Sequence, residues 1–311
     1  MKMTRRESLS MLSTSSLALA SILPIQLRSN EGAAKKEYHI ATNTYPWATF
    51  DQRTGRNSPL HSNDLLNRIH NAGIHGYEPI LNSSSELMGL KESLSKYQLE
   101  MRSFYVNSTL HEPSEAEKSI GRVLEIAEAA KALGAKIVVT NPSPIRWGGL
   151  EDKSDDQLKT QAKAINKLGE KLDKMGLQLA YHNHDAELRA GAREFHHMLT
   201  ATHPQYVKLC LDAHWVYRGC GNSEIAVFDV VEHYHKRIVE LHLRQSHKGT
   251  WREAFSLDGD IDYIRLISFL FNKGVKPHMV LEQAVEEKSP KALTAVQSHR
   301  IGVENLKTAL I

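Results

Sequence analysis

The sequence predicts a single (β/α)8 TIM barrel, an α/β fold, over residues 38–311. Amphipathic helical segments alternate with short, nearly continuous apolar strands, and glycines end several of the helices. Strands that are apolar on both faces are typical of a buried parallel sheet, and eight such units fit the length of this chain. A doubly wound open sheet is the alternative, but the Gly-rich turn expected after its first strand is not present in TNTYPWATF.

The first half of the chain is expected to form four strands, with helices between them. A polar loop follows the first strand, and Gly73 and Gly134 end the first and third helices. The expected strands are residues 38–47, 75–80, 101–110 and the β-branched run KIVVT (136–140), and the helices lie near 63–72, near 84–97 and in SEAEKSIGRVLEIAEAAKAL.

The second half repeats the same unit four times. A long helix from residue 155 leads into the strand QLAYHNH, and Gly274 separates the last helix–strand pair. The remaining elements are a helix at 192–202, the strand YVKLCLDAHW, a helix near 223–234, the strand RIVELHLR, the segment DYIRLISFLFNKGVKPHMVLEQA and the final helix SPKALTAVQSHRIGVENLKTAL.

The N-terminus resembles an export signal. Residues 1–20 carry the pair Arg5-Arg6 near their start, then an apolar, Ser-rich stretch, and an A-x-A site at Ala18–Ala20. We therefore expect a twin-arginine-like signal peptide and a periplasmic protein. Ser8 departs from the large apolar residue usual after that motif. Residues 21–37 are expected to be a linker. The signal is too short and too rich in serine to be retained as a membrane helix.

The composition argues against a nucleic-acid partner. The formal net charge is only +3, and part of it lies in the export segment. The two cysteines, Cys210 and Cys220, do not form a disulfide framework. Histidine is abundant, with 17 copies, and many of these follow predicted strands.

Ionisable side chains follow nearly every predicted strand, at the barrel end where such folds carry out chemistry. Because alternate strand residues share a side, His182 and His184 are both expected to face the barrel mouth. A carboxylate, an imidazole and a second carboxylate from strands six to eight can then converge with a group from strand five on one cation. The residues at these ends are Glu78, His111, Asn141, His182, His184, Asp212, His214, Glu240, His242 and Glu282.

Several of these residues also have an ordinary structural interpretation. Glu78 and His111 are expected either to bind substrate or to form a structural ion pair. Trp215 either floors a sugar site or packs in the core. His196 and His197 lie in a helical pattern and are interpreted as structural.

These motifs resemble the xylose isomerase-like barrels, the sugar phosphate isomerase/epimerase group. The resemblance covers the chain after residue 37 and rests on YHNHDAEL (181–188), LDAHWVYRGCG (211–221), VELHLR (239–244), GDIDY (259–263) and VLEQ (280–283). It implies one divalent metal ion (Mn, Zn, Co, Fe or Mg) held by Asp212, His242 and Glu282, with His214, Trp215 and Arg244 among the candidates for substrate binding.

Strand five departs from the family pattern. Epimerases of the group usually carry a metal-bound glutamate where this chain has His182. Either His182 binds the metal while His184 acts as the base, or the reverse, and Glu187 is a further candidate for catalysis. The frequent Lys-Asp after the strand-seven histidine is replaced by Arg244 and Gln245, so we expect a different substrate anchor.

The resemblance implies an enzyme acting on an unphosphorylated sugar or glycoside. The first hypothesis is a metal-dependent sugar isomerase or epimerase that moves a proton through an enediolate, with Glu282 or His184 as the base. The alternative is a lyase or dehydratase, similar to inosose dehydratase or a 3-keto-glycoside lyase, that uses the same intermediate. A non-catalytic sugar-binding barrel and an apurinic endonuclease rank lower, and a homo-oligomer is left open.

Overall fold

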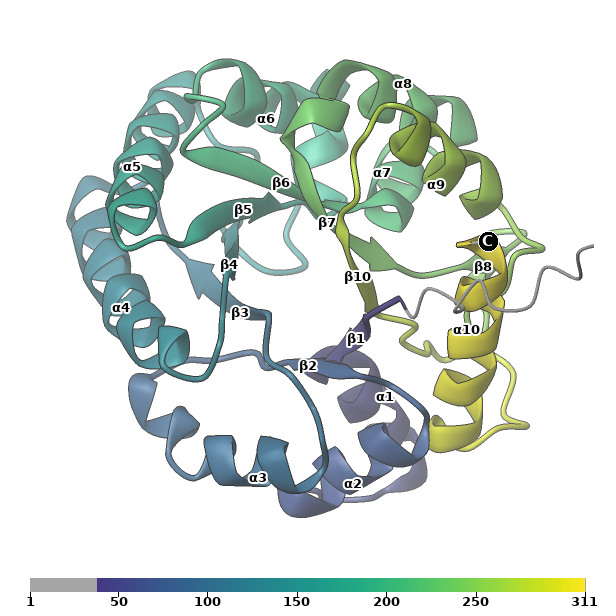
Figure 1. Cartoon of the computed structure of the whole chain (residues 1–311). Coiled ribbons are helices and arrows are strands. Elements are labelled where there is room, and N and C mark those ends of the chain that lie inside the picture. The colour runs from purple at the N-terminus through teal and green to yellow at the C-terminus, as the bar shows by residue number, and fades with distance from the viewer. Residues whose placement is uncertain (1–37, 311) are drawn as a thin grey trace, which may run out of the picture. The chain divides into compact units, whose positions relative to one another are not determined.

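Eight parallel strands form a nearly closed barrel, and helices surround it (Figure 1). The computed structural model describes residues 38–310. The strand order is β2-β1-β10-β7-β6-β5-β4-β3, which confirms the predicted TIM barrel. The strands are β1 Ile40–Asn43, β2 Gly76–Glu78, β3 Ser103–Ser108, β4 Ile137–Pro142, β5 Gln178–His182, β6 Val207–Asp212, β7 Ile238–Leu243 and β10 His278–Leu281.

The barrel closes between β2 and β3 through isolated bridges. Gly76 pairs with Glu100, and Ile80 pairs with Tyr105. Pro79 lies between these bridges and has no N–H to donate, but its carbonyl accepts a hydrogen bond of 2.9 Å from the Tyr105 N–H. The proline therefore explains why the ladder is interrupted at this one seam.

The outer helices bury one apolar face each against the barrel. In α5 the buried residues Leu158, Ile165 and Leu172 recur every seven positions, and Ser154 and Gln157 form a capping box at its start. The helices are α1 Thr44–Thr54, α2 Asn63–Asn71, α3 Leu90–Lys96, α4 Pro113–Lys131, α5 Asp155–Lys174, α6 Arg189–Thr200, α7 Ala213–Gly219, α8 Glu224–Tyr234, α9 Tyr263–Asn272 and α10 Ala295–Ala309, with 3-10 turns at η1 Ser84–Leu87, η2 Ala186–Leu188 and η3 His235–Arg237.

Four local details differ from the predicted elements. The segment expected to continue the first strand and then form a loop is helix α1, which Asn43 caps through its side chain. The expected helix at 84–97 is divided by Gly89, whose φ is 73°. Helix α7 and the hairpin of β8 (Ser246–His247) and β9 (Thr250–Trp251) have no counterpart in the prediction.

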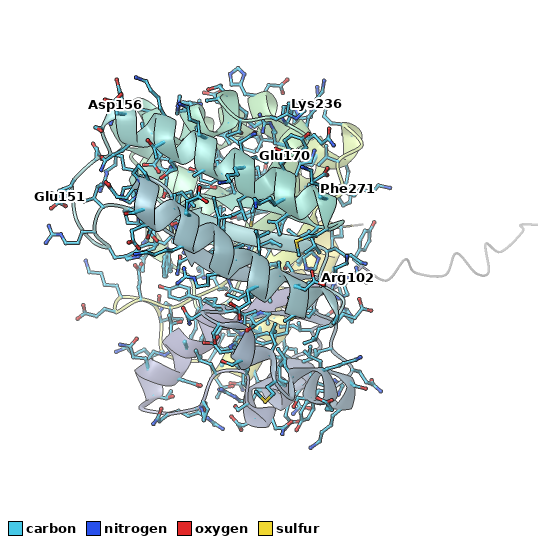
Figure 2. All side chains as sticks on the ribbon, turned by 90° about the vertical axis from the view of Figure 1, so that its left-hand side faces the viewer. Arg102, Glu151, Asp156, Glu170, Lys236 and Phe271 are labelled. Carbon is cyan, nitrogen blue, oxygen red and sulfur yellow. The ribbon has the colours of Figure 1, made fainter. Side chains whose placement is uncertain are left out.

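The two ends of the barrel differ in chemistry. Figure 2 shows the long helices α4 and α5 from the side, with Glu151 and Asp156 at the end where the strands finish and Arg102 at the opposite end. His39, His75 and His278 gather at the end where the strands begin, with ring centroids 5.3 Å apart for His39 and His278. The candidate ligands all belong to the other end.

The predicted signal peptide (1–20) and linker (21–37) lie outside the described residues, so export stays a prediction. Among residues 38–310, none of the helices has the length and apolar character needed to span a bilayer. Cys210 and Cys220 are both free thiols, Cys210 buried and Cys220 half-buried.

The buried His299 is expected to make this fold sensitive to acid. Burial lowers the pKa of His299 to about 4, and the ring stacks on Trp47 at 4.2 Å. Between that pKa and the ordinary 6.5 the unfolded chain binds a proton that the native chain does not, so the free energy of unfolding falls as the pH drops from about 6.5 to 4. His299→Phe is expected to reduce this loss by up to about 1.4 kcal/mol per pH unit.

Urea unfolding at pH 4, 5 and 6.5 measures the effect. His70→Gln, at an exposed position of α2, serves as the control and should follow the wild-type curve. Parallel pH dependence in wild type and His299→Phe would contradict the assignment.

Candidate active site

Four neighbouring strands bring four potential metal ligands together at the barrel mouth. In the sheet, His182 of β5 pairs with Cys210, Asp212 of β6 pairs with His242, and β10 places Glu282 directly after Leu281. One ligand atom from each of His182, Asp212, His242 and Glu282 lies within 4.8 Å of the others. His242 Nδ1 is 3.2 Å from Glu282 Oε2, and His182 Nε2 is 4.0 Å from Asp212 Oδ2.

The unsatisfied polar atoms of this cluster fit a divalent cation. Both ring nitrogens of His182 and Oδ2 of Asp212 are buried without a hydrogen-bond partner. Such orphaned atoms are rare in folded proteins and call for an explanation. Two imidazoles and two carboxylates suit Zn²⁺, Mn²⁺, Co²⁺ or Fe²⁺, so the donor set fits the metal that the sequence predicts.

The charges are divided unevenly over the four groups. Burial opposes ionisation of Glu282, but His242 and Arg244 hold the pKa of its carboxyl well below the usual range. Burial raises the pKa of Asp212 to about 7, although Arg244 partly offsets this. Burial also lowers the pKa of His182 well below its usual value, and the neighbouring His242 lowers it further. His182 is therefore a neutral imidazole with one ring nitrogen free to act as a ligand near neutral pH.

Arg244 lies beside the four groups, in an aromatic enclosure. Its Nη2 donates to Glu282 Oε2 at 2.8 Å and lies 3.8 Å from Asp212 Oδ2. The guanidinium carbon lies 4.3 Å from the ring centroid of Trp251 and 5.0 Å from that of Trp215. Its Nη1 is buried without a hydrogen-bond partner. That atom is available to a substrate oxygen.

A cavity of about 460 Å³ opens above this cluster. Its inner wall contains His182, Arg244 and Glu282, and its outer wall contains residues of the loop after β4. Ligand sites of roughly this size hold small organic molecules. The full lining is Tyr45, Ile80, Tyr105, Asn107, Pro144, Arg146, Trp147, Gly148, Gly149, Leu150, His182, His184, Asp185, Ala186, Arg189, Trp215, Arg244 and Glu282.

His184 stands in the cavity wall between two tryptophans. Its ring lies edge-on to Trp147 at 5.2 Å and 5.7 Å from Trp215, and its Nδ1 has no hydrogen-bond partner. Burial lowers the pKa of His184 to about 4. A neutral imidazole facing the cavity can accept a proton from a bound molecule.

Glu187 holds the loop after β5 in place. Its Oε1 accepts from Asn141 Nδ2 at 3.0 Å, and its Oε2 accepts from the His184 N–H at 2.7 Å. The carboxyl is buried, and burial raises its pKa. Both oxygens of Glu187 accept hydrogen bonds, and the residue does not line the cavity. Glu187 therefore positions the backbone of His184.

Of the predicted substrate-binding residues Trp215, His214 and His111, only Trp215 lines the cavity. Trp215 lines the cavity, whereas His214 is buried against Trp251 and Tyr217. Burial lowers the pKa of His214 to about 2. His111 is buried in the β3–α4 loop and does not line the cavity.

Glu78 lies below the cavity instead of in it. Its Oε1 is 3.1 Å from His242 Nε2, and its Oε2 accepts from the Ser103 hydroxyl at 2.6 Å. Glu240 Oε1 accepts from the same His242 nitrogen at 3.2 Å. Both carboxyls thus face the side of the His242 ring that points away from Glu282.

Sequence reasoning missed three residues of the site. Asn43 donates from Nδ2 to Glu282 Oε1 at 2.5 Å, and Tyr105 packs edge-on to His182 at 5.3 Å. Asn43 and Tyr105 lie on strands and share the inward parity, which could have identified them. Trp147 lies in a loop without periodicity, so no pattern in the sequence pointed to it.

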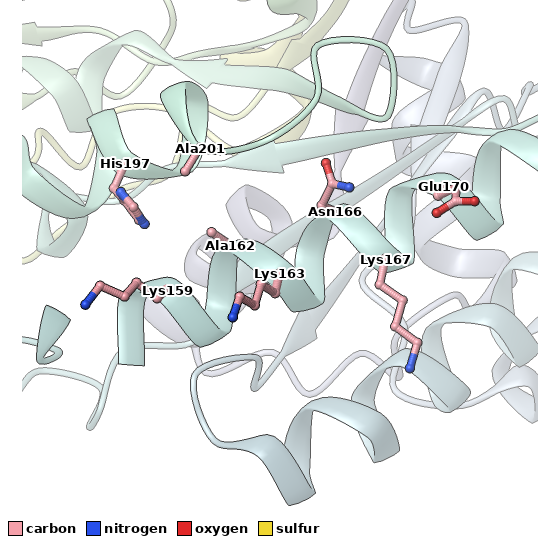
Figure 3. A pocket seen from close by; sticks show the side chains of 8 residues that line it. All are labelled: Lys159, Ala162, Lys163, Asn166, Lys167, Glu170, His197 and Ala201. Carbon is pink, nitrogen blue, oxygen red and sulfur yellow. The ribbon is translucent and has the colours of Figure 1, made fainter. Parts of the chain in front are cut away.

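A second hollow, of about 410 Å³, lies on the outer surface along α5 (Figure 3). Lys159, Lys163 and Lys167 extend from successive turns of the helix there. Lys159 pairs with Asp156 at 3.1 Å and Lys167 with Glu117 at 2.7 Å, so two of the three charges are already matched. No potential metal cluster lies among the residues lining this hollow. The barrel mouth is therefore the candidate active site.

Comparison with known proteins gives one family. The family model described as "Xylose isomerase-like TIM barrel" matches residues 66–305. An inosose dehydratase from Clostridium perfringens is 25% identical over 241 residues, covering 68% of this chain and 78% of that protein.

Solved structures share the fold. A sugar phosphate isomerase/epimerase from Parabacteroides distasonis superposes with a TM-score of 0.68 at 18% identity, over 89% of this chain and 96% of that one. The 3-keto-D-glucoside 4-epimerase YcjR from E. coli gives 0.61 at 14% identity, over 88% and 100%. With the family model matching most of its length, the chain belongs to the xylose isomerase-like TIM barrel family.

Proposed function

We propose that this protein is a divalent-metal-dependent sugar isomerase or epimerase that removes a carbon-bound proton beside the carbonyl of a keto-sugar. The observation that carries the proposal is the convergence of His182, Asp212, His242 and Glu282 next to the cavity, where His182 and Glu282 line its wall. A divalent cation bound there supplies a Lewis acid that polarises a carbonyl and stabilises the negative charge of an enediolate.

The residues around the cluster supply the proton transfer and the orientation. Glu282 is ionised and faces the cavity, so it can accept the proton on one side of the substrate. His184, neutral and free at Nδ1, is the second proton carrier. Arg244 Nη1 donates to a substrate oxygen. Tyr45, Trp147 and Trp215 surround the site with apolar surface that limits access of water.

A second candidate function is elimination from the same intermediate, as a dehydratase or a 3-keto-glycoside lyase. Strand five offers His184 beside the candidate ligand His182 instead of a second carboxylate. After His184 accepts the carbon-bound proton of the substrate, its imidazolium can pass that proton to the leaving group. The inosose dehydratase relative and the keto-glucoside epimerase neighbour act on keto-sugar-like compounds by name, which supports this class of substrate.

The test is product analysis in D₂O. Metal-loaded protein is incubated with free ketoses and with 3-keto-glycosides, and the products are followed by NMR and mass spectrometry. Deuterium incorporation without fragmentation supports the isomerase or epimerase. Release of water or of an aglycone supports the lyase. Binding of these sugars without any deuterium exchange would leave a non-catalytic barrel.

Trp147 favours a ligand with a second ring. Its side chain is 55% exposed in the cavity wall, and Arg189 holds the loop around it through hydrogen bonds to Asp152 Oδ1 (3.0 Å) and the Gly149 carbonyl (2.9 Å). An exposed tryptophan held in this way is suited to stacking on a ring. Trp147→Ala is expected to raise KM for 3-keto-glycosides about tenfold and to leave KM for free ketoses unchanged.

Steady-state kinetics on both substrate classes measures this difference. Ile225→Ala removes an exposed apolar side chain on α8, outside the cavity, and should leave both KM values unchanged. An equal rise in KM for ketoses and glycosides would show that Trp147 contacts the reacting sugar itself.

The proposed location is the periplasm, reached by the twin-arginine route, and rests on residues 1–20 alone. Fractionation of cells that express the full chain, compared with an Arg5→Lys, Arg6→Lys variant, tests it. We expect the wild type in the periplasmic fraction and the variant in the cytoplasm.

A further inference from the structure

The layer beneath the cavity contains two carboxyl groups that the proposed reaction does not use. Glu78 and Glu240 are fully buried, as is the His242 ring that they contact. The apolar residues of this part of the barrel interior include Tyr105, Ile137, Val139, Ala180 and Cys210. Two buried carboxyls in such surroundings are expensive for folding, each by several kcal/mol if charged. Their presence is consistent with a role in the site.

Both carboxyls are anchored, and both face one nitrogen. Ser103 donates to Glu78 Oε2 at 2.6 Å, and Cys210 Sγ lies 3.5 Å from Glu240 Oε1. The remaining Oε1 of Glu78 and Oε1 of Glu240 lie 3.1 and 3.2 Å from His242 Nε2. A rotation of the imidazole ring that moves Nε2 toward the cavity would break its hydrogen bond with Glu240 Oε1.

The opposite nitrogen of the ring faces the cluster. His242 Nδ1 is 3.2 Å from Glu282 Oε2, which belongs to the four-residue set above. An imidazole that donates one N–H to a carboxylate presents the lone pair of its other nitrogen and is a stronger ligand. We propose that Glu240, together with Glu78, is a positioning residue that fixes His242 with Nδ1 toward the metal and Nε2–H toward the barrel interior.

This inference rests on the proposed metal-dependent function. It adds Glu78 and Glu240 to the site as residues that contact neither the metal nor the substrate. An alternative use of the same atoms is a second cation, because Glu78, Glu240 and His242 also lie close enough together to hold one. Against it, neither Glu78 nor Glu240 lines the cavity, whereas His182 and Glu282 of the four-residue set do. Counting bound ions separates the two uses.

The test is Mn²⁺ binding to the full chain, measured by electron paramagnetic resonance of free Mn²⁺, together with the visible spectrum of the Co²⁺-loaded protein. Glu78→Gln and Glu240→Gln keep a side-chain oxygen close to His242 Nε2 but remove the charge of the carboxylate. We expect Mn²⁺ affinity to fall about 10-fold in either variant and about 100-fold in the double variant, with altered Co²⁺ bands. The single variants serve if the double variant does not fold.

Glu253→Gln is the matched control. Glu253 is also a buried carboxylate, but it pairs with Arg53 at 2.7 Å and caps backbone N–H groups of Ala292 and Leu293, away from His242. It should leave Mn²⁺ affinity and the Co²⁺ spectrum unchanged.

Two results would overturn the inference alone. One is wild-type affinity in the folded double variant, and the other is two Mn²⁺ ions per wild-type chain with one of them lost in that variant. A wild-type chain that binds no divalent ion overturns the metal-dependent function and the inference with it. One bound ion with the expected losses, but without turnover of any sugar, supports the inference and overturns only the proposed reaction.

Discussion

Replacing Glu282 by glutamine is expected to lower kcat for the preferred sugar by about 10³-fold. Glu282 lies in the cavity wall and is held ionised by His242 and Arg244, so it supplies both a metal ligand and the most accessible base. The amide has nearly the same shape, and its one oxygen can still accept from either Asn43 Nδ2 or Arg244 Nη2. The change therefore removes charge and basicity with little change in packing.

Single-turnover kinetics at saturating metal separates the two roles of Glu282. Because saturating metal restores occupancy, the remaining loss of rate reports proton transfer. Glu287→Gln, at an exposed position five residues later, is the control and should retain wild-type kcat. Activity of Glu282→Gln within about tenfold of wild type would identify His184 as the base instead.

Replacing Asp212 by asparagine is expected to weaken divalent-metal binding by more than 100-fold, beyond the 10–100-fold typical of losing a supporting partner. Asp212 Oδ1 caps α7 by accepting from the Trp215 N–H at 2.9 Å, and asparagine is an equally good cap. Oδ2, which has no hydrogen-bond partner, is the atom assigned to the metal. The substitution thus removes the anionic ligand and keeps the helix start.

Isothermal titration with Mn²⁺ or Zn²⁺ measures this loss, and thermal melting of the metal-free protein checks the fold. We expect the melting temperatures of metal-free wild type and Asp212→Asn to agree closely, while metal stabilises only the wild type. Asp229→Asn, at an exposed position of α8, is the control. Equal metal stabilisation of wild type and Asp212→Asn would remove Asp212 from the ligand set.

The barrel and the convergence of His182, Asp212, His242 and Glu282 could be predicted because both follow from local periodicity. Strand parity determines which residues face inward, and parallel strands place their carboxyl ends together. The same reasoning located His184 in the cavity wall. The assignment of roles to these residues stays a prediction for the measurements above.

Depth within the barrel could not be predicted in the same way. Glu78 is the last residue of β2, yet it lies level with Glu240, two residues before His242 on β7. Strand tilt and stagger determine this level, and a single sequence does not encode them as a periodic signal. For this reason Glu78 was expected at the mouth, whereas in the structure it contacts the Nε2 side of His242, outside the cavity lining.

The first helix and the cavity wall were missed for other reasons. Helix α1 begins in TYPWATF, where a proline and several aromatic or β-branched residues obscure the helical pattern, and its side-chain cap Asn43 also ends a strand. Trp147 belongs to a loop that Arg189, forty residues later, holds in place. Contacts over that separation leave no signal in a local pattern.

The most direct test of the account is a crystal structure of the Mn²⁺-loaded protein with anomalous diffraction at the metal edge. We expect one anomalous peak within coordination distance of His182, Asp212, Glu282 and Nδ1 of His242. We also expect that Nε2 of His242 keeps its contact with Glu240. No ordered ion at the barrel mouth, or an ion coordinated by Nε2 with Glu78 and Glu240, would contradict the account.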